Sequence, residues 1–406
     1  MILRPRVVDF STHFPGPLAS RHLSQLGADV IKVENRETGD GNRGTPPFVE
    51  GESPFHHFLN AGARSIAIDS RSPAWLRVTE ALAGWADVVI VGNRPSTAAR
   101  LHLDFERLVK VNDDLVYCLI TGYGLAGPWS GYPAHGLNPE AYAGTIPLEW
   151  LADGRPTPRD DFRATGVTMA GVEAAIGILA ALYRRDQGLG AQHVHVSMWE
   201  SALSWLWRDV VVQLNTGTPW RGNKDIGPRY STYRTADNRV ILVCPTEQHF
   251  WERFCDVVGM PEGARSRGDW SSGADRGREF PQEYGEIQQR MATRTLDEWL
   301  RLLGDADVPV APILDWTYAI DSDHARANGV LASIRTDKVE MQIPAIPVSV
   351  VSVGAGGPVD AARLAEDHKN KTAAVRSAPK LGQHSDEILA ELGLSELTDQ
   401  LSKAGS

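Results

Sequence analysis

The sequence has only three cysteines in 406 residues, Cys118, Cys244 and Cys255. Their spacing fits neither a CxxC metal site nor a disulfide framework, so we expect buried thiols in a reducing compartment. The opening residues MILRPRVVDF lack the long apolar core and the small-residue cleavage site of a signal peptide. These two absences predict a cytoplasmic protein.

The sequence also lacks the two common nucleotide-binding fingerprints. The turn after the first strand-like run reads STHFPGP and has no GxGxxG spacing, and no GxxxxGK[ST] run occurs. An NAD or FAD enzyme is therefore disfavoured, because those glycines let a pyrophosphate approach the backbone. A P-loop nucleotidase is excluded because the GxxxxGK[ST] run that cradles the phosphates is missing.

An excess of positive charge is missing as well. The net charge is -10 and the pI is about 5.7, which argues against nucleic acid or an anionic membrane as a partner. A local basic pocket for a phosphate-bearing ligand remains compatible with this balance. The content of 42% hydrophobic and 23% charged residues is that of a globular protein, long enough for two domains of roughly 100 to 200 residues.

Short apolar runs alternate with helical segments through the first third of the chain, which predicts a Rossmann-like α/β domain with a parallel sheet. The predicted strands are residues 6–11, 29–34, 65–69, 87–92 and 115–122, and the predicted helices are residues 17–26, 73–85 and 97–110. Linkers rich in Gly and Pro then surround a smaller α+β domain. The predicted division is a large domain at 1–200, a linker at 201–229, a small domain at 230–305, a linker at 306–330, and a return to the large domain at 331–406.

A nearly all-apolar helix is predicted over Met169–Tyr183, begun by Thr165 or Thr168 as a cap and ended by Gly188. Apolar residues cover all of its faces and small residues recur along it, so neighbouring elements can approach closely. We expect a buried central helix, too short to span a membrane, for which about 20 apolar residues are needed.

The run AGVEAAIGILAALYRR followed by GLGAQHVHVSM resembles the class III CoA-transferases, the family of formyl-CoA and carnitine CoA-transferases that also contains the alpha-methylacyl-CoA racemases. DVIKVENRETGD, LNAGARSIAID, ADVVIVGNRPSTAARLHLD and LVYCLITGYGLAGPW resemble further family segments in the family's order. The resemblance implies CoA or an acyl-CoA as a substrate, a carboxylic acid as its partner, and no tightly bound cofactor. It also implies an interlocked, ring-shaped dimer, either a homodimer or a heteromer with a family paralogue.

The resemblance breaks at the family's catalytic residue. A Gly-Asp pair precedes this helix in the family, and the aspartate is the transferase nucleophile. The pair falls here on Gly166 and Val167, and a valine has no nucleophilic atom. We interpret the nearby Asp160 and Asp161 as parts of a solvated loop and Glu173 as a hydrogen-bonding group.

The resemblance also suggests which residues contact the CoA nucleotide and which could move a proton. The nucleotide contacts implied are Arg36, Asn60, Arg64, Asn93, Arg94 and Arg100, the last matching the arginine of the family's RLGL segment. His135 matches a proton-transfer histidine of the racemases, and Glu247 matches their supporting glutamate. No metal site is expected, since His56, His57, His193 and His195 have no completing pattern.

Three functions therefore remain open from the sequence. The chain is a CoA-transferase that uses another carboxylate or direct attack by the acceptor acid, or the non-catalytic subunit of a heteromeric transferase, or a protein that performs racemase-like proton chemistry through His135. The loops at Tyr132–Pro139 and around Trp220 are rich in aromatic and apolar residues, which hints at a bulky or hydrophobic acyl group.

Overall fold

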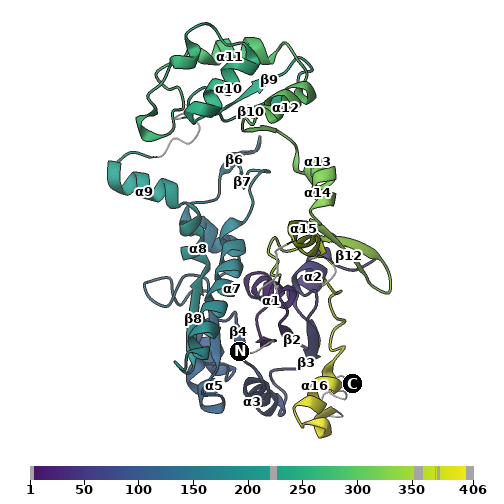
Figure 1. Ribbon diagram of the computed structural model, residues 1–406. Coiled ribbons are helices and arrows are strands. Elements are labelled where there is room, and N and C mark those ends of the chain that lie inside the picture. The colour runs from purple at the N-terminus through teal and green to yellow at the C-terminus, as the bar shows by residue number, and fades with distance from the viewer. Residues whose placement is uncertain (1–3, 220–225, 352–359, 371, 373–374, 399–406) are drawn as a thin grey trace. The chain divides into compact units, whose positions relative to one another are not determined.

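The structure is a computed structural model that describes residues 4–219, 226–351, 360–370, 372 and 375–398 (Figure 1). Two compact units make up the chain. Unit 1 comprises residues 1–210 and 323–406, and unit 2 comprises residues 211–322. Trp220, one of the residues expected near the acyl group, lies outside the described residues.

A six-stranded, fully parallel sheet forms the centre of unit 1, with strand order β3-β2-β1-β4-β5-β8. The strands are β1 (Arg6–Asp9), β2 (Asp29–Glu34), β3 (Arg64–Ala67), β4 (Val88–Val91), β5 (Val116–Thr121) and β8 (Gln192–Ser197). The five strands predicted in the first third of the chain are confirmed within two residues at each end. Because β2 and β4 flank β1, the direction of winding reverses between β1 and β4.

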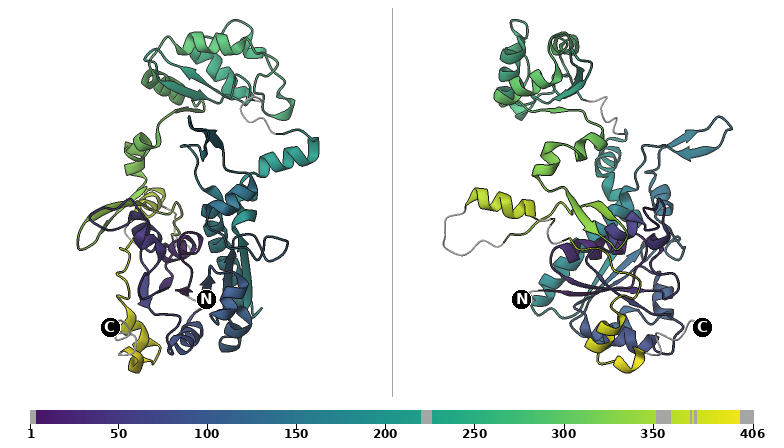
Figure 2. Two further views of the ribbon diagram at one scale, coloured as in Figure 1. Left: turned by 180° about the vertical axis from the view of Figure 1, so that it is seen from behind. Right: turned by 90° about the vertical axis from the view of Figure 1, so that its right-hand side faces the viewer.

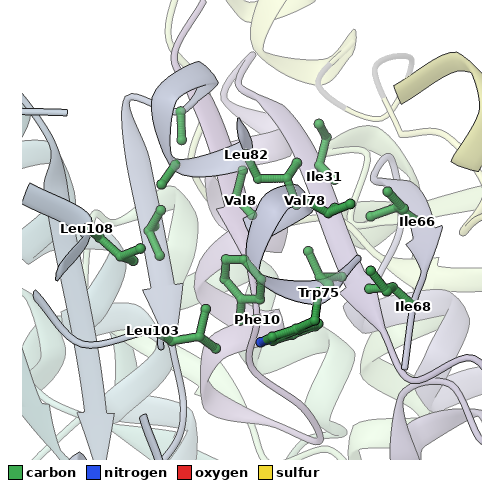
Figure 3. Close-up of a cluster of buried hydrophobic side chains, with 14 of the residues drawn as sticks. Val8, Phe10, Ile31, Ile66, Ile68, Trp75, Val78, Leu82, Leu103 and Leu108 are labelled. Carbon is green, nitrogen blue, oxygen red and sulfur yellow. The ribbon is translucent and has the colours of Figure 1, made fainter. Parts of the chain in front are cut away.

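Alternate residues along these strands point to opposite faces, and each face has its own apolar core. On one face Val8, Ile31 and Ile66 pack against Val78 and Leu82 of a covering helix (Figure 3). On the other face Val7, Val30, Val88 and Val116 pack against two helices, α1 (Pro15–Gln25) and α7 (Thr165–Asp186). The near-continuous Val and Ile content of the strands follows from this burial on both sides.

Helices cover both faces. Those in the first part of unit 1 are α1 (Pro15–Gln25), α2 (Pro54–Leu59), α3 (Trp75–Trp85), α4 (Pro95–Arg100), α5 (Phe105–Val111), α6 (Leu137–Ala143), α7 (Thr165–Asp186) and α8 (Met198–Trp205). The single helix predicted over residues 97–110 is wrong, because α4 and α5 are separate. His102 takes a φ of 59°, and the Asp104 side chain then caps α5 by accepting a hydrogen bond from the Arg107 amide.

Helix α7 is the predicted central helix, but two expectations about it are wrong. It has 22 residues and is long and apolar enough to cross a membrane, so the length argument fails, although half of the apolar stretch is buried inside the protein. It is also not buried all round, because Ile176, Leu179 and Tyr183 are exposed. The expected close approach is confirmed at Gly171, where a Cβ would lie 2.8 Å from the Pro15 carbonyl oxygen of α1.

The rest of unit 1 consists of hairpins and C-terminal helices. They are β6 (Leu148–Trp150) with β7 (Pro156–Pro158), α14 (Asp323–Ala327), β12 (Leu331–Arg335) with β13 (Glu340–Pro344), α15 (Ala361–Lys369) and α16 (Ser385–Glu391). Figure 2 shows the β6–β7 hairpin standing away from the sheet, and Trp150 at its end is 72% exposed. Helix α16 packs beside β3, where Ile388 and Leu389 are buried.

Unit 2 is built on a three-stranded antiparallel sheet, order β11-β10-β9. Its elements are β9 (Ser231–Arg234), β10 (Val240–Val243), α10 (Gln248–Val258), α11 (Glu283–Met291), α12 (Leu296–Asp305), β11 (Val310–Pro312) and α13 (Trp316–Ile320). The two stretches predicted as linkers are structured in part. α9 (Trp207–Thr216) lies in the first, and β11, which pairs with β10, lies in the second.

Candidate functional site

The loops that follow β1 and β4 meet at the point where the winding of the sheet reverses. A Cβ added to Gly92, after β4, would lie 2.9 Å from the Ser11 side chain, after β1. His13 follows β1 in the same loop, and Asn93 and Arg94 follow β4. Open parallel sheets bind ligands outside the carboxyl ends of their strands at such a reversal. This edge is therefore the candidate site.

His13 is held there in a strained conformation. Its φ of 66° lies in the left-handed region, which a residue with a side chain rarely adopts. The His13 amide donates to Asp40 Oδ1 at 3.2 Å, and its carbonyl oxygen accepts from the Asn42 side chain. The ring lies against Gly41, where any Cβ would collide with it. Local strain persists only where surrounding contacts fix it, and it concentrates at functional sites.

A buried ion network of Lys32, Asp9 and Asp40 holds this loop in place. Lys32 Nζ lies 3.0 Å from Asp9 Oδ2 and 3.2 Å from Asp40 Oδ2, and it also donates to the Ser11 carbonyl oxygen. Burial lowers the pKa of the Lys32 ammonium, but the carboxylates of Asp9 and Asp40 outweigh burial and raise that pKa above its ordinary value. Since Asp40 also binds the amide of His13, one charged network joins β1, β2 and the His13 loop.

His135 lies beside His13 at this edge. The two ring centroids are 5.9 Å apart and the rings are nearly perpendicular, at 87°. His135 is exposed, and its amide donates to Asn138 Oδ1 at 2.9 Å, which fixes the turn that begins α6. Neither imidazole makes a ring hydrogen bond to another residue in the described part of the chain. His13 was not predicted as a site residue, because its neighbours in space come from segments far along the chain.

The start of α7 is capped by a glutamate from α6. Glu140 is fully buried, and its Oε1 accepts hydrogen bonds from the amides of Gly166 and, at 3.4 Å, Val167. Thr145 donates its hydroxyl to the other carboxylate oxygen. A buried carboxylate therefore does lie next to position 167. Sequence reasoning missed Glu140, because 26 residues separate it from the amides that it binds.

The prediction that Thr165 or Thr168 caps α7 is wrong, because the distant Glu140 supplies the cap instead. Ala164 holds the cap position, and its side chain makes no capping bond. Thr168 instead donates its hydroxyl to the Ala164 carbonyl oxygen at 3.0 Å. Val167 is 4% exposed, and its side chain lies against Gly136, where a Cβ would approach to 2.9 Å. Position 167 is thus buried beside the His135 turn.

The other carboxylates considered from the sequence lie elsewhere. Asp160 and Asp161 are exposed, as predicted, and Asp161 forms an ion pair with Arg159. Glu173 accepts a hydrogen bond from the Ser201 hydroxyl, which confirms the hydrogen-bonding role expected for it.

Glu247 belongs to unit 2, whereas His135 belongs to unit 1. Glu247 stands at the N-cap position of α10 and accepts from the Thr246 hydroxyl at 3.0 Å. It is half-buried.

Two of the predicted arginines follow β4 in the chain and are exposed. Arg94 donates from Nη1 to the Gly131 carbonyl oxygen at 2.9 Å and so ties the loop before α6 to the β4 loop. Arg100, at the end of α4, is exposed and has no hydrogen-bond or ion-pair partner among the described residues. Asn93 is half-buried between β4 and α4, and Arg36 is half-buried two residues after β2.

Arg64 lies at the opposite end of the sheet. It is the first residue of β3, so it stands at the amino edge, and its guanidinium pairs with Asp29, Glu387 and Glu391 at 2.8 to 3.1 Å. These acids raise the pKa of Arg64, although burial acts in the other direction. Its partners give Arg64 a structural role, anchoring α16, and separate it from the nucleotide contacts expected beside it.

Asn60 and the remaining histidines are also structural in their contacts. Asn60 is buried and hydrogen-bonds through Nδ2 to His56 Nδ1 at 3.1 Å. His195 pairs with the Thr121 hydroxyl at 3.0 Å, and His193 packs on Phe105. In the described ranges, no group of three or more His, Cys, Asp or Glu side chains is arranged to hold a metal ion.

The model of CoA-transferase family III matches residues 5–385 of this sequence. The chain belongs to CoA-transferase family III. The acetyl-CoA:oxalate CoA-transferase of Acetobacter aceti is 29% identical over 352 residues, covering 85% of this chain and 87% of that protein. The succinate–glutarate CoA-transferase of Agrobacterium fabrum is 29% identical over 413 residues, covering 97% and 96%.

Solved structures agree with the family in fold. A hypothetical protein from Mycobacterium tuberculosis superimposes with a TM-score of 0.72 at 25% identity, covering 95% of this chain and 97% of its own. A CaiB/BaiF family protein from Brucella suis gives a TM-score of 0.70 at 24% identity, covering 96% and 98%. The relatives with named activities use CoA thioesters and carboxylic acids, so the family chemistry requires a site for both.

Proposed function

We propose that this family III protein binds a CoA thioester at the carboxyl edge between β1 and β4 and exchanges its CoA with a carboxylic acid. The observation that carries the proposal is that Arg94, after β4, is bonded to the loop before α6, the helix whose Glu140 caps the buried start of α7. Arg100 follows at the end of α4 and has no hydrogen-bond or ion-pair partner among the described residues. Cations at the edge suit the phosphates of CoA, and the enclosed helix start suits a dry reaction position.

No covalent enzyme thioester can form at residue 167, because the valine side chain has no nucleophilic atom. We propose direct exchange instead. An oxygen of the acceptor carboxylate attacks the thioester carbonyl carbon. The C–S bond breaks, CoA departs as the thiolate, and the donor and acceptor acyl groups are joined as a mixed anhydride. The thiolate then attacks the acceptor carbonyl of that anhydride, which forms the new thioester and releases the donor as its carboxylate. No oxidant, reductant or protein nucleophile is consumed.

Nucleotide binding by Arg100 is tested by calorimetry with free CoA. Hydrogen bonds to a charged group contribute about 1.5 to 3 kcal/mol, so Arg100→Ala is expected to weaken CoA binding by roughly 10- to 150-fold. Arg64→Ala is the matched control, since Arg64 is tied to Asp29 and α16. It is expected to lower stability with little effect on CoA affinity. Equal losses of affinity in both variants would contradict the assignment of Arg100.

Direct exchange is tested by restoring the missing carboxylate. The unmodified protein with an acyl-CoA and no acceptor is expected to give no residue trapped by hydroxylamine or borohydride. Val167→Asp is expected to give a trapped adduct at residue 167, because the carboxylate would stand at the enclosed start of α7. A covalent adduct on the unmodified protein, at Glu140 for example, would refute direct exchange.

A second candidate function is proton exchange at the acyl α-carbon, favoured by the adjacent rings of His13 and His135. A thioester acidifies that carbon, and histidine side chains are common proton-transfer groups, so one ring could remove the proton and the other return it. The measurement is deuterium incorporation into an acyl-CoA in heavy water. Loss of incorporation in both His13→Ala and His135→Ala, with CoA binding intact, would favour this function, whereas its absence in the unmodified protein would exclude it.

We also propose that a second chain of the family covers the exposed apolar face of α7, as a homodimer or with a paralogue that carries the aspartate. Ile176 and Tyr183 are 61% and 69% exposed, which is unusual for large apolar side chains in the middle of a helix. Sedimentation measures this directly. A monomer at micromolar concentration, with no change on adding the paralogue, would exclude both assemblies.

A further inference from the structure

Five aromatic side chains form one connected group beside the candidate site. The ring cluster consists of Tyr123, Trp129, Tyr132, Tyr142 and Trp199. Trp129 and Tyr142 are stacked, with centroids 4.6 Å apart and planes 30° from parallel. Tyr132 meets the edge of Trp129 at 5.1 Å, and Trp199 tilts against Tyr142 at 5.7 Å. Tyr123 lies beneath Trp129 and Tyr142 and is 7% exposed.

The fold brings these rings to the same edge of the sheet as the candidate site. Tyr123 follows the carboxyl end of β5, and Trp199 follows the carboxyl end of β8. Tyr142 lies on α6, the helix whose Glu140 caps the start of α7. One short helix, α6, therefore carries both a ring of the cluster and the glutamate that caps the start of α7.

The ring cluster is open to solvent, although it has the composition of a core. Trp129, Tyr132 and Tyr142 are 36%, 54% and 47% exposed. None of the three tyrosine hydroxyls, nor either indole N–H, makes a hydrogen bond to another residue in the described parts of the chain. Exposed aromatic groups with free polar tips mark binding surfaces more often than incomplete cores, since Tyr and Trp present an apolar body and a wet end.

We propose that the ring cluster binds the acyl portion of the thioester, and that this portion carries an aromatic ring. The inference deepens the proposed function and rests on it. A flat aromatic acyl group can stack against the exposed Trp129–Tyr142 pair, and its polar substituents can meet the free hydroxyls. The five rings themselves are uncharged, and the guanidinium beside their loop, that of Arg94, is bonded to the Gly131 carbonyl oxygen.

The test compares three probes on the purified protein by calorimetry, without an acceptor acid. The probes are free CoA, benzoyl-CoA and succinyl-CoA. We expect benzoyl-CoA to bind more tightly than succinyl-CoA. Because an aromatic pair contributes about 0.5 to 1.5 kcal/mol, Tyr142→Ala and Trp129→Ala are each expected to weaken benzoyl-CoA by roughly two- to tenfold, with free CoA unchanged. Tyr142→Phe keeps the ring and is expected to restore most of the affinity.

The matched control is Trp207→Ala, because Trp207 is 58% exposed and lies outside the ring cluster. It is expected to leave all three affinities unchanged. Equal binding of benzoyl-CoA and succinyl-CoA, or benzoyl-CoA affinity unaffected by Tyr142→Ala and Trp129→Ala, would overturn the inference while leaving the proposed function intact. Failure of free CoA to bind would instead overturn the proposed function. A change of sedimentation mass in Trp129→Ala, with benzoyl-CoA affinity unaltered, would assign the cluster to a subunit contact and overturn the inference.

Discussion

Replacing Glu140 by alanine is expected to destabilise the start of α7 strongly. The substitution removes the only acceptor seen for the Gly166 amide in the described structure and leaves that amide buried. A hydrogen bond to a charged group contributes about 1.5 to 3 kcal/mol, and an unsatisfied buried amide costs about 1 to 3 kcal/mol. The bond from Val167 is longer and adds little. We therefore expect Glu140→Ala to lower the free energy of unfolding of unit 1 by about 3 to 5 kcal/mol.

Glu140→Gln is the matched control, because the amide oxygen of glutamine can still accept from the Gly166 amide. It loses only the charge, and its amide nitrogen can donate to the Thr145 hydroxyl, so the expected loss is about 1 kcal/mol. Urea unfolding followed by circular dichroism measures the global effect. Hydrogen exchange of the amides at the start of α7 measures the local one, and it separates unit 1 from unit 2.

A loss below about 0.5 kcal/mol in Glu140→Ala, with unchanged exchange at Gly166, would refute the capping role. Equal losses in Glu140→Ala and Glu140→Gln would show that the negative charge, rather than the acceptor geometry, stabilises the helix.

Three further predictions concern stability. Gly171→Ala is expected to cost about 1 to 3 kcal/mol because its Cβ would meet the Pro15 carbonyl oxygen, whereas Gly84→Ala, whose Cβ meets nothing closer than 3.6 Å, is expected to stabilise by about 0.5 to 1 kcal/mol in the same urea assay. Lys32→Met leaves two buried carboxylates unpaired and is expected to cost about 3 to 5 kcal/mol; a variant as stable as the parent at neutral pH would contradict the ion network. Burial lowers the pKa of His56 to about 4, so as the pH falls below 6.5 this histidine takes up a proton in the unfolded chain before it does so in the folded chain. The free energy of unfolding is therefore expected to fall by about 1.4 kcal/mol per pH unit between pH 6.5 and 4. A His56→Gln variant with the same slope would exclude this cause.

The architecture of unit 1 follows from sequence pattern to a large extent. The strands are runs of Val and Ile that are buried on both faces, so a continuous apolar signal marks them within two residues. The break between α4 and α5 was missed because it depends on the backbone of His102, a residue that does not usually adopt a left-handed conformation. The exposed face of α7 was missed because hydrophobicity does not say which neighbour covers a residue.

The candidate site was predicted less completely than the fold. Its arginines after β4 were found, since a loop at the carboxyl end of a strand is a local feature of the chain. Arg64 was placed with them although β3 begins at that residue, so it emerges at the other edge and anchors α16. Glu140 and His13 were missed because their partners, the start of α7 and the His135 turn, are distant in sequence and become adjacent only after folding.

Because Glu140 supplies the cap, the stability of the start of α7 and the chemistry proposed at position 167 depend on two different residues. Since the amides at the start of α7 are satisfied from another helix, the side chain of residue 167 is not needed to cap that helix, although it is buried against Gly136. We therefore expect selection for a stable helix start to act on residue 140 and, under the proposed exchange, selection for the chemistry to act on residue 167. A saturation library at position 167, scored once for soluble yield and once for thioester turnover, would display the two pressures as separate profiles. Under the proposed exchange, a single substitution at residue 167 is expected to change the reaction while the architecture stays the same.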